Sequence, residues 1–484
     1  MYDVCIIGAG VIGCAIAREL SKYNLDICIL EKEEDVSCGA SKANSGIVHG
    51  GYAAKHGTLK GRLNAIGNRM FRKLEEELNF GFRETGALVI GFTDSDYEEL
   101  QKLYENGVKN ETLGMKIIGQ ERIREIEPHI HPDVKWALYC STVGITSPYE
   151  LTIALAENSI ANGVTLKLSA AVKDIVMEKD FFQVFTMEET IKSRYVVNAA
   201  GAYSDRIASM VSLNDFRILP RRGQYILLDK SQGHLANTVI FQVPTKLGKG
   251  ILVTPTYHGN LMLGPNAEEV EWREDVGTTE EVIRYIVETA RQSIPDFDMT
   301  KALTSFSGIR ATSDRGDFII EESKVPGFIN VAGIESPGLT ASPAIALLVV
   351  DILKKAGLSF TENSKFNPYR KPIIQKKRAD FSGKVDALNP EENIICRCEQ
   401  VTEAEIVDAI RREIPIKSMD AIKRRVRSGM GLCQGSFCGP RVRSIIARET
   451  GLSQEEIIPR GKGSSILPPR AERIFFTKLN QNKD

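Results

Sequence analysis

The stretch YDVCIIGAGVIGCAIARELSKYNLDICILEK, residues 2–32, decides the fold of this chain. An apolar run at residues 4–7 predicts a buried parallel strand, and three glycines follow it directly. A helical pattern over residues 11–22 leads into a second apolar run at residues 27–30. Strand, glycines, helix and strand within 31 residues predict the opening βαβ unit of a Rossmann-like nucleotide-binding domain.

The glycines and the acid at the end of this unit have mechanical roles. Gly8 permits the tight turn, Gly10 lets the backbone approach a pyrophosphate, and Gly13 lets the helix pack close to the strand. The helix N-terminus offers free N–H groups to the phosphates. Glu31 ends the second strand, where a carboxylate can accept hydrogen bonds from a ribose. The unit therefore predicts a bound dinucleotide.

Length, charge and hydropathy exclude several classes of protein. The chain has 484 residues and a net charge of −1, which argues against nucleic acid as the main partner. No apolar run approaches the roughly 20 residues of a membrane-spanning helix. The first strand begins at residue 2, so we expect no targeting peptide. We expect a cytoplasmic protein with no direct membrane span, with contact to the inner membrane face possible only through a partner.

The rest of the chain predicts an α/β fold with three domains. Small residues gather after the first unit and again in NAAGAYSD, while short alternating runs over residues 217–272 predict an antiparallel sheet. A strand at 328–331, a turn at 333–338 and a helix at 341–354 repeat the opening logic. We expect a discontinuous Rossmann-like domain into which an α+β substrate domain is inserted, followed by a small helical domain. The expected boundaries are 1–80, 145–215 and 300–365 for the first domain, 81–144 and 216–299 for the second, 366–392 for a linker, and 393–484 for the third with its tail.

Four further motifs give the chain a recognisable pattern. They are NSGIVHGG at 44–51, NAAGAYSD at 198–205, SGIRATSD at 307–314 and GIESPGLTASPA at 333–344. With the βαβ unit, they resemble the FAD-dependent oxidoreductases of the D-amino-acid oxidase superfamily over roughly residues 1–365. Within it, the chain resembles the group of FAD-dependent glycerol-3-phosphate dehydrogenases and L-2-hydroxyglutarate dehydrogenases.

The resemblance implies FAD at the first glycine motif. It implies that the ribose lies on Glu31, that the loop Ser41–Ile47 covers the flavin, and that the turn Gly333–Thr340 reaches its pyrimidine end. The residues expected to bind the cofactor are Gly8, Gly10, Val11, Ile12, Gly13, Glu31, Lys32, Ser41, Asn44, Ser45, Gly46, Ile47, Val172, Ala200, Gly201, Gly308, Gly333, Ser336, Gly338, Leu339 and Thr340.

Arg310 and His49 are the expected catalytic residues. A guanidinium binds a carboxylate or phosphate through two hydrogen bonds, so Arg310 is the candidate clamp for a small anionic substrate. A free imidazole titrates near about pH 6.5, which suits His49 as general base. A surface ion pair for Arg310 and a purely structural hydrogen bond for His49 are the alternatives. Lys249 and Tyr257 are weaker candidates, because both lie near a turn.

Four cysteines near the C-terminus predict a metal centre. Cys396 and Cys398 form CRC, and Cys433 and Cys438 form CQGSFC. Thr402 and the glutamate three residues later predict a capped helix between the two motifs. The spacing resembles the bacterioferritin-associated-ferredoxin type of [2Fe–2S] domain, with a zinc site or a degenerate site as the alternatives. The basic run at residues 423–427 is a candidate docking surface for an acidic partner, or a solvated helix face.

Flavin and cluster together indicate a dehydrogenase that hands electrons singly to a protein partner or subunit. The leading hypothesis is oxidation of sn-glycerol 3-phosphate to dihydroxyacetone phosphate. An L-2-hydroxyglutarate dehydrogenase is the first alternative, and an amine dehydrogenase of the sarcosine or proline type the next. A non-catalytic electron-transfer subunit is the alternative from a different class.

Overall fold

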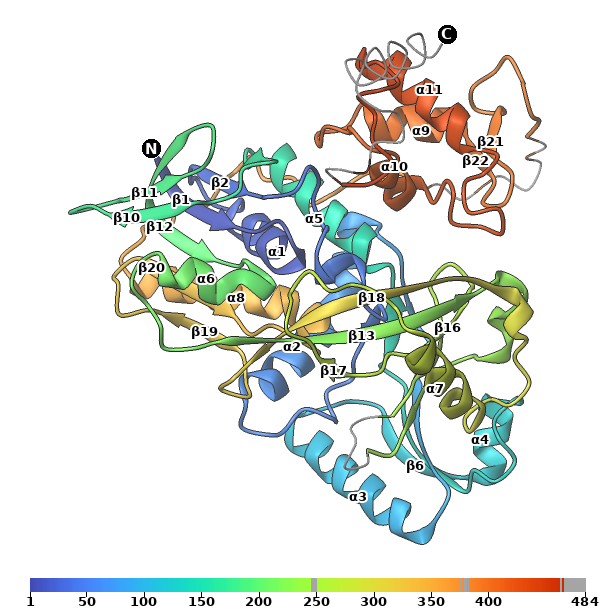
Figure 1. The fold of residues 1–484 in the computed structure, drawn as a ribbon. Coiled ribbons are helices and arrows are strands. Elements are labelled where there is room, and N and C mark those ends of the chain that lie inside the picture. Colours follow the sequence, from blue (N-terminus) through green and yellow to red (C-terminus); the bar gives the residue numbers. More distant parts are fainter. Residues whose placement is uncertain (245–249, 375–376, 378–380, 382, 462–463, 465–484) are drawn as a thin grey trace, which may run out of the picture. The chain divides into compact units, whose positions relative to one another are not determined.

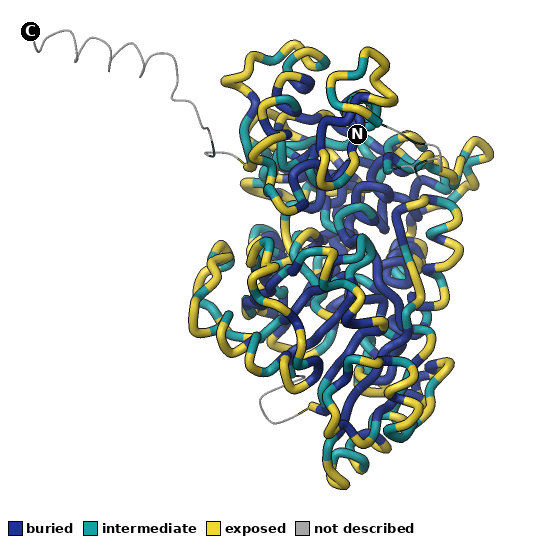
Figure 2. The backbone as a smooth tube through the Cα atoms, turned by 90° about the vertical axis from the view of Figure 1, so that its right-hand side faces the viewer, coloured by how far each residue is buried: buried dark blue, intermediate teal, exposed yellow. Residues whose placement is uncertain are grey.

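The computed structural model describes residues 1–244, 250–374, 377, 381, 383–461 and 464. The chain divides into two compact units, the first formed by Met1–Lys32 and Val36–Lys371 and the second by Glu33–Asp35 and Pro372–Asp484. Figure 2 shows buried residues gathered inside the units and exposed residues along loops and outer turns. Each unit is described by itself below.

The first unit contains the predicted parallel sheet. Its centre runs in the order β12-β1-β2-β9, formed by Thr190–Asn198, Tyr2–Ile7, Ile27–Leu30 and Thr165–Lys167, and all neighbouring pairs are parallel. β20 (Phe328–Ala332) also pairs with β12 in parallel. Antiparallel strands complete the eight-stranded sheet, namely β10 (Asp174–Met177), β11 (Phe182–Phe185) and β19 (Ile319–Glu322). The near-continuous burial of β1, β2 and β20 is typical of a sheet covered on both faces.

Long helices pack with this sheet and with one another. They are α1 (Val11–Leu20), α2 (Leu59–Leu78), α5 (Pro148–Ala161) and α8 (Gly338–Lys355), with the short α6 (Ser204–Ser209) beside β12. The expected start of the last long helix at residue 341 is wrong. The N–H of Ala341 already bonds to the carbonyl of Pro337, so Gly338 and Thr340 lie in the first helical turn.

A mostly antiparallel sheet of nine strands forms the second layer of the first unit. Figure 1 shows its two longest strands, β13 (Ile218–Leu228) and β18 (Ala302–Ser313), side by side. The remaining strands are β17 (Glu268–Glu269), β16 (Leu261–Leu263), β15 (Val253–Pro255), β14 (Val239–Gln242), β5 (Ala87–Gly91), β7 (Trp136–Cys140) and β6 (Met115–Gly119). Its accompanying helices are α3 (Asp94–Lys109), α4 (Gln120–Ile126) and α7 (Glu280–Arg291). The strands between residues 217 and 272 pair antiparallel, as predicted, whereas β14 pairs in parallel with β5, which lies outside that range.

A three-stranded sheet accompanies these two large sheets. It runs in the order β3-β8-β4, with the bounds Ile47–Val48, Gly144–Thr146 and Phe82–Glu84. β3 leads directly into His49, one of the expected catalytic residues. The sheet therefore fixes the backbone that carries this histidine.

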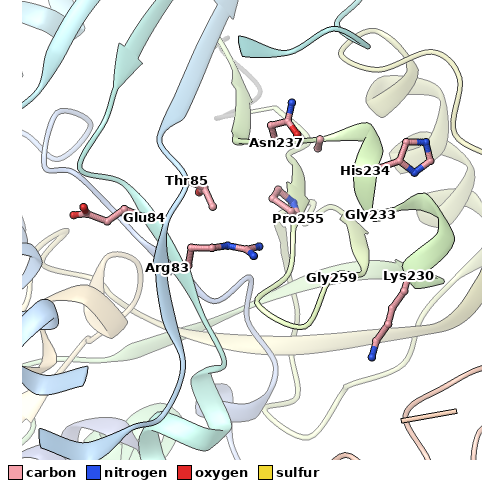
Figure 3. A pocket seen from close by; sticks show the side chains of 10 residues that line it. Arg83, Glu84, Thr85, Lys230, Gly233, His234, Asn237, Pro255 and Gly259 are labelled. Atoms are coloured by element: carbon pink, nitrogen blue, oxygen red, sulfur yellow. The ribbon is translucent and has the colours of Figure 1, made fainter. Parts of the chain in front are cut away.

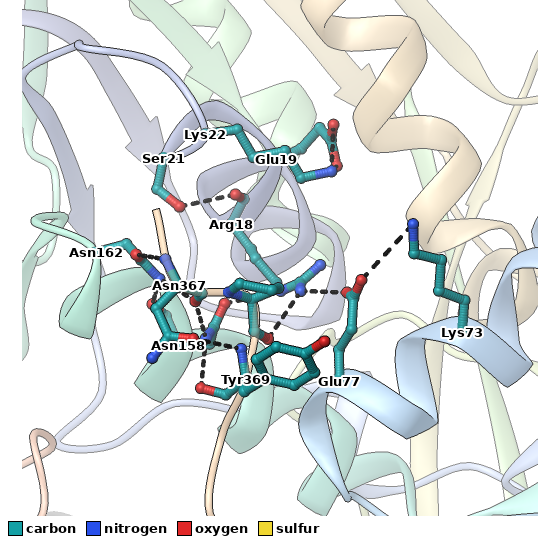
Figure 4. A network of polar contacts seen from close by, with 11 residues as sticks. Arg18, Glu19, Ser21, Lys22, Lys73, Glu77, Asn158, Asn162, Asn367 and Tyr369 are labelled. Atoms are coloured by element: carbon teal, nitrogen blue, oxygen red, sulfur yellow. Dashed lines mark hydrogen bonds and ion pairs between the residues drawn. The ribbon is translucent and has the colours of Figure 1, made fainter. Parts of the chain in front are cut away.

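A polar network ties the end of the first unit to its helices (Figure 4). The buried Arg18 of α1 donates to Glu77 of α2 at 2.6 Å and to Asn158 of α5 at 2.9 Å. The side-chain amide of Asn158 in turn donates to the carbonyls of Asn367 and Tyr369. The segment that leaves α8 is therefore fastened to three helices through hydrogen bonds as far as residue 370.

The second unit is small and mainly helical. It contains the hairpin β21 (Ile394–Cys396) and β22 (Val401–Thr402), with α9 (Glu403–Ile410), α10 (Met419–Val426) and α11 (Gly439–Thr450). The predicted capping box is present, because Thr402 accepts from the N–H of Glu405 and Glu405 accepts from the N–H of Thr402. The α/β fold class with an inserted sheet domain and a small helical domain is confirmed.

None of the helices in the described ranges is long and apolar enough to cross a lipid bilayer. Residues 465–484, the tail of the expected third domain, lie outside the described residues.

Candidate functional site

The glycine turn after β1 has the close packing that the sequence predicts. Gly8 has φ +107°, and a Cβ atom there would lie 2.6 Å from the carbonyl oxygen of Ala199. A Cβ on Gly13 would lie 2.0 Å from the carbonyl oxygen of Gly8. Any side chain at either position would collide with backbone, so strand, turn and helix approach one another only because both residues are glycine.

The start of α1 is faced by acceptor side chains. Glu31 accepts a hydrogen bond from the N–H of Ala9 at 2.8 Å, and the hydroxyl of Ser41 accepts from the N–H of Val11 at 2.9 Å. A Cβ on Gly10 would have only the Ser41 hydroxyl within 4 Å, at 3.2 Å. Protein side chains therefore hold the N–H groups of Ala9 and Val11, and the space beside Gly10 at the helix N-terminus is open apart from the Ser41 hydroxyl.

The loop before His49 is locked by its own polar groups. Asn44 donates to the carbonyls of Ala40 and Ser41 and accepts from the N–H of Gly46 at 2.8 Å. Gly46 has φ +65°, and a Cβ there would lie 2.3 Å from the carbonyl oxygen of Thr146. The loop therefore holds one conformation against the small sheet.

Strand β18 places Arg310 between two of the predicted cofactor segments. Gly308, Arg310 and Thr312 alternate along the strand and so share one face. A Cβ on Gly308 would lie 2.0 Å from the carbonyl oxygen of Ala43, and the Thr312 hydroxyl donates to Glu335 at 2.8 Å. Arg310 therefore lies between the loop at 41–47 and the turn at 333–340, although its position in the sequence is far from both.

The guanidinium of Arg310 is held on one side and unsatisfied on the other. Its Nη2 atom donates to the carbonyl of Asn266 at 3.0 Å and lies over Gly223, where a Cβ would come within 2.6 Å. Its Nη1 atom is buried and has no hydrogen-bond partner among the described residues. Burial raises the pKa of the neighbouring Tyr225 phenol, against the effect of Arg310, so that phenol supplies no counter-charge. A buried donor without an acceptor fits a ligand that brings an anionic oxygen.

His49 is fixed by contacts from three parts of the chain. Its backbone N–H donates to the hydroxyl of Thr340 at 2.8 Å, and its carbonyl accepts from the side-chain amide of Asn68 at 3.0 Å. The imidazole Nε2 lies 3.4 Å from the hydroxyl of Ser336, and the ring centroid lies 5.8 Å from that of Phe241. These contacts fix the position of His49 through its backbone and bring its imidazole beside the Ser336 hydroxyl.

Glu335 is a residue that the sequence analysis missed. It lies in the turn directly before Ser336, and its carboxylate accepts from Lys60 at 2.7 Å and from Thr312 at 2.8 Å. Burial acts to raise its pKa, but Lys60, Thr312 and the charge of Arg310 together lower the pKa below its ordinary value. In the sequence, the available signal was that Glu335 is the one acidic residue in the motif GIESPGLTASPA.

The other predicted cofactor residues lie in the first unit with less specific contacts. Lys32 is exposed, and its ammonium lies 4.6 Å from the ring centroid of Tyr203. The remaining positions are Ile12, Ser45, Ile47, Val172, Ala200, Gly201, Gly333, Gly338 and Leu339. Tyr257 packs its ring against Gly81, and Lys249 lies outside the described residues. Their individual roles stay predictions.

These features fit a dinucleotide cofactor. The glycine turn lies at the start of α1, where a helix has N–H groups without intrahelical partners, and the second segment of small residues, at 199–201, lies directly beside it. β20 lies beside β12, and Asn198 of β12 donates to Asn330 of β20 at 3.0 Å. The carboxyl end of β20 leads into Gly333. β1 and β20 therefore flank β12, and the N-termini of α1 and α8 follow these two strands of one sheet.

The four cysteines of the second unit stand as two pairs. Cys396 shares a hydrogen bond with Cys438, which lowers the pKa of Cys396 to about 6, and the sulfurs of Cys398 and Cys433 lie 3.7 Å apart. No three cysteine, histidine or acidic side chains of the described chain are close enough to form a metal site as they stand. Each pair nevertheless joins one cysteine of CRC to one of CQGSFC, and a [2Fe–2S] cluster uses four thiolates. The donor set therefore fits such a cluster.

The loop between the two motifs brings backbone close to these thiols. A Cβ on Gly431 would lie 2.3 Å from the Cβ of Cys398, and the hydroxyl of Ser428 donates to Cys438 at 3.5 Å. Leu432 and Phe437 are largely exposed beside the cysteines. The loop therefore depends on glycine for its approach to the thiols.

Both interpretations of the basic run at 423–427 are wrong for its three arginines, while Lys423 is half-buried. Arg424, Arg425 and Arg427 are buried at 4%, 1% and 6% exposure, so they form neither a solvated face nor a docking surface. Arg427 pairs with Glu399 at 2.9 Å, and Arg424 and Arg425 both donate to Asp35, which belongs to the same unit. Because these buried arginines pair with acidic residues of their own unit, they do not offer their charge to a partner protein.

The sequence matches two protein families. Residues 3–352 match the family described as DAO, FAD dependent oxidoreductase, and residues 394–448 match the family described as BFD-like [2Fe-2S] binding domain. The predictions of FAD, of a [2Fe–2S] cluster and of an oxidoreductase that acts on a CH–OH group are confirmed.

Three relatives give the range of similarity. A glycerol 3-phosphate dehydrogenase from Caloramator mitchellensis is 51% identical over 98% of this chain and 100% of that protein. A mitochondrial L-2-hydroxyglutarate dehydrogenase from Nematostella vectensis is 29% identical over 74% of this chain and 91% of that protein. The structure of a dithionite-reduced L-α-glycerophosphate oxidase from Mycoplasma pneumoniae with FAD bound is 30% identical, with a TM-score of 0.72 over 76% of this chain and 98% of that chain.

Proposed function

Because the chain belongs to the FAD dependent oxidoreductase family, we propose that it oxidises sn-glycerol 3-phosphate to dihydroxyacetone phosphate. The observation that supports this most is the 51% identity to a glycerol 3-phosphate dehydrogenase over the full length of that relative. An alignment of that extent takes in both units, so the relative shares the flavin domain and the cluster domain.

The proposal assigns the electrons to a protein partner. The similarity covers 98% of the glycerophosphate oxidase chain but only 76% of this chain. That oxidase therefore has no segment that corresponds to the cluster domain. A one-electron centre added to a flavin domain suits delivery of single electrons to an acceptor other than O₂.

In the proposed reaction, bound FAD supplies the two-electron acceptor for the carbinol carbon. Arg310 binds the phosphate, since its Nη1 atom is buried and lacks a partner in the described structure. His49 accepts the hydroxyl proton at Nε2, and Ser336, 3.4 Å from that atom, orients the imidazole. Glu335 and Thr340 hold the turn that carries Ser336 against the strand of Arg310 and the loop of His49.

The proposed reaction also needs residues that bind the two cofactors. In this proposal Gly8, Gly10 and Gly13 present the backbone to the pyrophosphate, and Glu31 binds the ribose. In the second unit, Cys396, Cys398, Cys433 and Cys438 hold the cluster.

A substrate comparison tests the proposal. Under anaerobic conditions, glycerol 3-phosphate bleaches the flavin absorbance of the purified enzyme, and L-2-hydroxyglutarate does so far more slowly. The reverse preference would establish the 2-hydroxy-acid dehydrogenase instead. Replacement of Arg310 by Gln raises the KM for glycerol 3-phosphate by roughly 10- to 100-fold, as expected for loss of charged hydrogen bonds. An Arg310→Ala enzyme with full turnover on every tested substrate would favour a non-catalytic electron-transfer subunit.

A further inference from the structure

The first unit has a hollow that the proposed reaction does not use. Its volume is about 550 Å³, which is within the range of small-molecule sites. Residues from three separated segments line it, as Figure 3 shows, namely Arg83, Glu84, Thr85, Lys230, Gly233, His234, Ala236, Asn237, Pro255 and Gly259. None of them belongs to the predicted cofactor or catalytic residues.

Three of the ten residues that line the hollow are basic. Arg83 comes from β4, while Lys230 and His234 come from a short 3₁₀ helix after β13. The guanidinium of Arg83 makes no hydrogen bond or ion pair to any residue of the described structure, and Figure 3 shows it extended towards Pro255.

Glu84 is the one acidic residue in the lining of the hollow, and its charge is neutralised by an arginine that does not line it. Glu84 is ion-paired with Arg72 of α2, and Figure 3 shows the Glu84 side chain directed away from Arg83. The Arg83 guanidinium therefore lies at the hollow without Glu84 as its counter-charge. A guanidinium binds a phosphate group through two hydrogen bonds.

The walls of the hollow are fixed by backbone contacts. A Cβ on Gly233 would lie 1.9 Å from the carbonyl oxygen of Gly259, so these two segments touch through backbone. On the other side, the fully buried carboxylate of Glu127 accepts from the N–H groups of Asn237, at 2.9 Å, and Thr238. A hollow with fixed walls needs little ordering when a ligand enters.

One end of the hollow lies away from the proposed substrate clamp. Arg310 pairs in register with Arg221 on β13, whereas Lys230 follows the opposite end of the same strand. Nine residues of extended chain span roughly 30 Å. One molecule of glycerol 3-phosphate cannot contact both Arg310 and Lys230.

We propose that this hollow is a second anion site that binds a small molecule through a phosphate group, with Arg83 as its main ligand. Free inorganic phosphate and the phosphate of a metabolite ester share this chemistry. The site is independent of which alcohol the enzyme oxidises.

Equilibrium dialysis of the full-length holoenzyme with radiolabelled inorganic phosphate tests the proposal. The double variant Arg83→Gln/Lys230→Gln loses one bound phosphate per chain or binds it at least about tenfold more weakly, as expected for loss of charged hydrogen bonds. Arg310→Gln retains that phosphate. Lys73→Gln, which removes a cation at 82% exposure on α2, binds as the wild type does.

Competition identifies the source of the phosphate group. Displacement of the labelled phosphate by a lower concentration of glucose 6-phosphate indicates a metabolite ester, and displacement only by excess phosphate indicates the free ion. Unchanged phosphate binding in a double variant that keeps the wild-type melting temperature would overturn the proposal. So would a wild-type enzyme whose phosphate binding is entirely lost in Arg310→Gln. Neither result depends on turnover with glycerol 3-phosphate.

Discussion

At the scale of single residues, the proposed site combines one proton acceptor with one cation. His49 is held through its backbone by Thr340 and Asn68, while its imidazole lies 3.4 Å from the Ser336 hydroxyl and packs against the ring of Phe241. Arg310 has a fixed Nη2 atom and a buried Nη1 atom without a partner in the described part of the chain. The two residues should therefore affect different kinetic constants.

Replacement of His49 by Gln should lower kcat and leave KM nearly unchanged. Loss of a general base costs typically about 10²- to 10⁴-fold in rate. The measurement is the rate of anaerobic flavin bleaching at saturating substrate. Ser336→Ala should cost far less, because Ser336 only orients the imidazole. Equal losses in both variants would show that His49 has a structural role.

Replacement of Glu335 by Gln should destabilise the first unit in a pH-dependent way. Lys60, Thr312 and Arg310 lower the pKa of Glu335, so its ion pair stabilises the fold above the pKa of a free glutamate, near about 4.3. This stability is lost as the pH falls through the lowered folded pKa. We expect a cost of about 1–3 kcal/mol at pH 7 that shrinks towards pH 3.

The melting temperatures of wild type and Glu335→Gln across this pH range provide the measurement. Glu99→Gln is the matched control, because its pair with Lys102 is exposed and should change stability little at any pH. A Glu335→Gln deficit that is the same at pH 7 and pH 3 would contradict the proposed ion pair.

At the scale of elements, two close approaches depend on glycine. One joins β1, its turn and α1 at Gly8 and Gly13, and the other brings the loop at 429–435 against Cys398. In both places a single methyl group would meet backbone or a ligand residue. Elements that carry cofactors are thus positioned by the absence of side chains.

Gly431→Ala should impair cluster assembly. A Cβ there would lie 2.3 Å from the Cβ of Cys398, so the loop or the cysteine must move. We expect fewer than two irons per chain and a weaker visible absorbance beyond that of the flavin. Gly461→Ala is the control in the same unit, because its Cβ would have no described atom within 4 Å. A full iron content in Gly431→Ala would show that the loop does not support Cys398.

At the scale of the whole molecule, the chain joins a flavin unit to a cluster unit that is held together by its own core and ion pairs. The two units would perform consecutive half-reactions, substrate oxidation in the first and electron delivery from the second. A defect in one should leave the other half-reaction measurable.

Cys398→Ser should separate these half-reactions. Substrate should still bleach the flavin at the wild-type rate, because every residue proposed for substrate oxidation lies in the first unit. Steady-state reduction of a one-electron acceptor should fall at least about tenfold, since loss of a cluster ligand compromises the cluster. Unchanged acceptor reduction in a protein shown to lack the cluster would mean that electrons leave the flavin directly.

The sequence by itself determined the βαβ unit, the two families and the four cysteines. These features follow from local rules, in which residues 2–32 contain strand, turn and helix signals and the ligand cysteines are close neighbours in two short motifs. Even the capping box of α9 was evident from Thr402 and Glu405, because its partners are three residues apart.

Only the tertiary structure decided which distant residues meet. Glu335, Lys60 and Thr312 form one network although 275 residues separate the first two, and no periodicity links them. The tertiary structure also decided the burial of the arginines of α10, which the charge pattern of the sequence predicts to be exposed. It likewise decided which segments meet at the hollow of Arg83. Sequence patterns report which face of an element is apolar, whereas the pairing of charges across elements depends on the register of strands and helices that only the packed fold fixes.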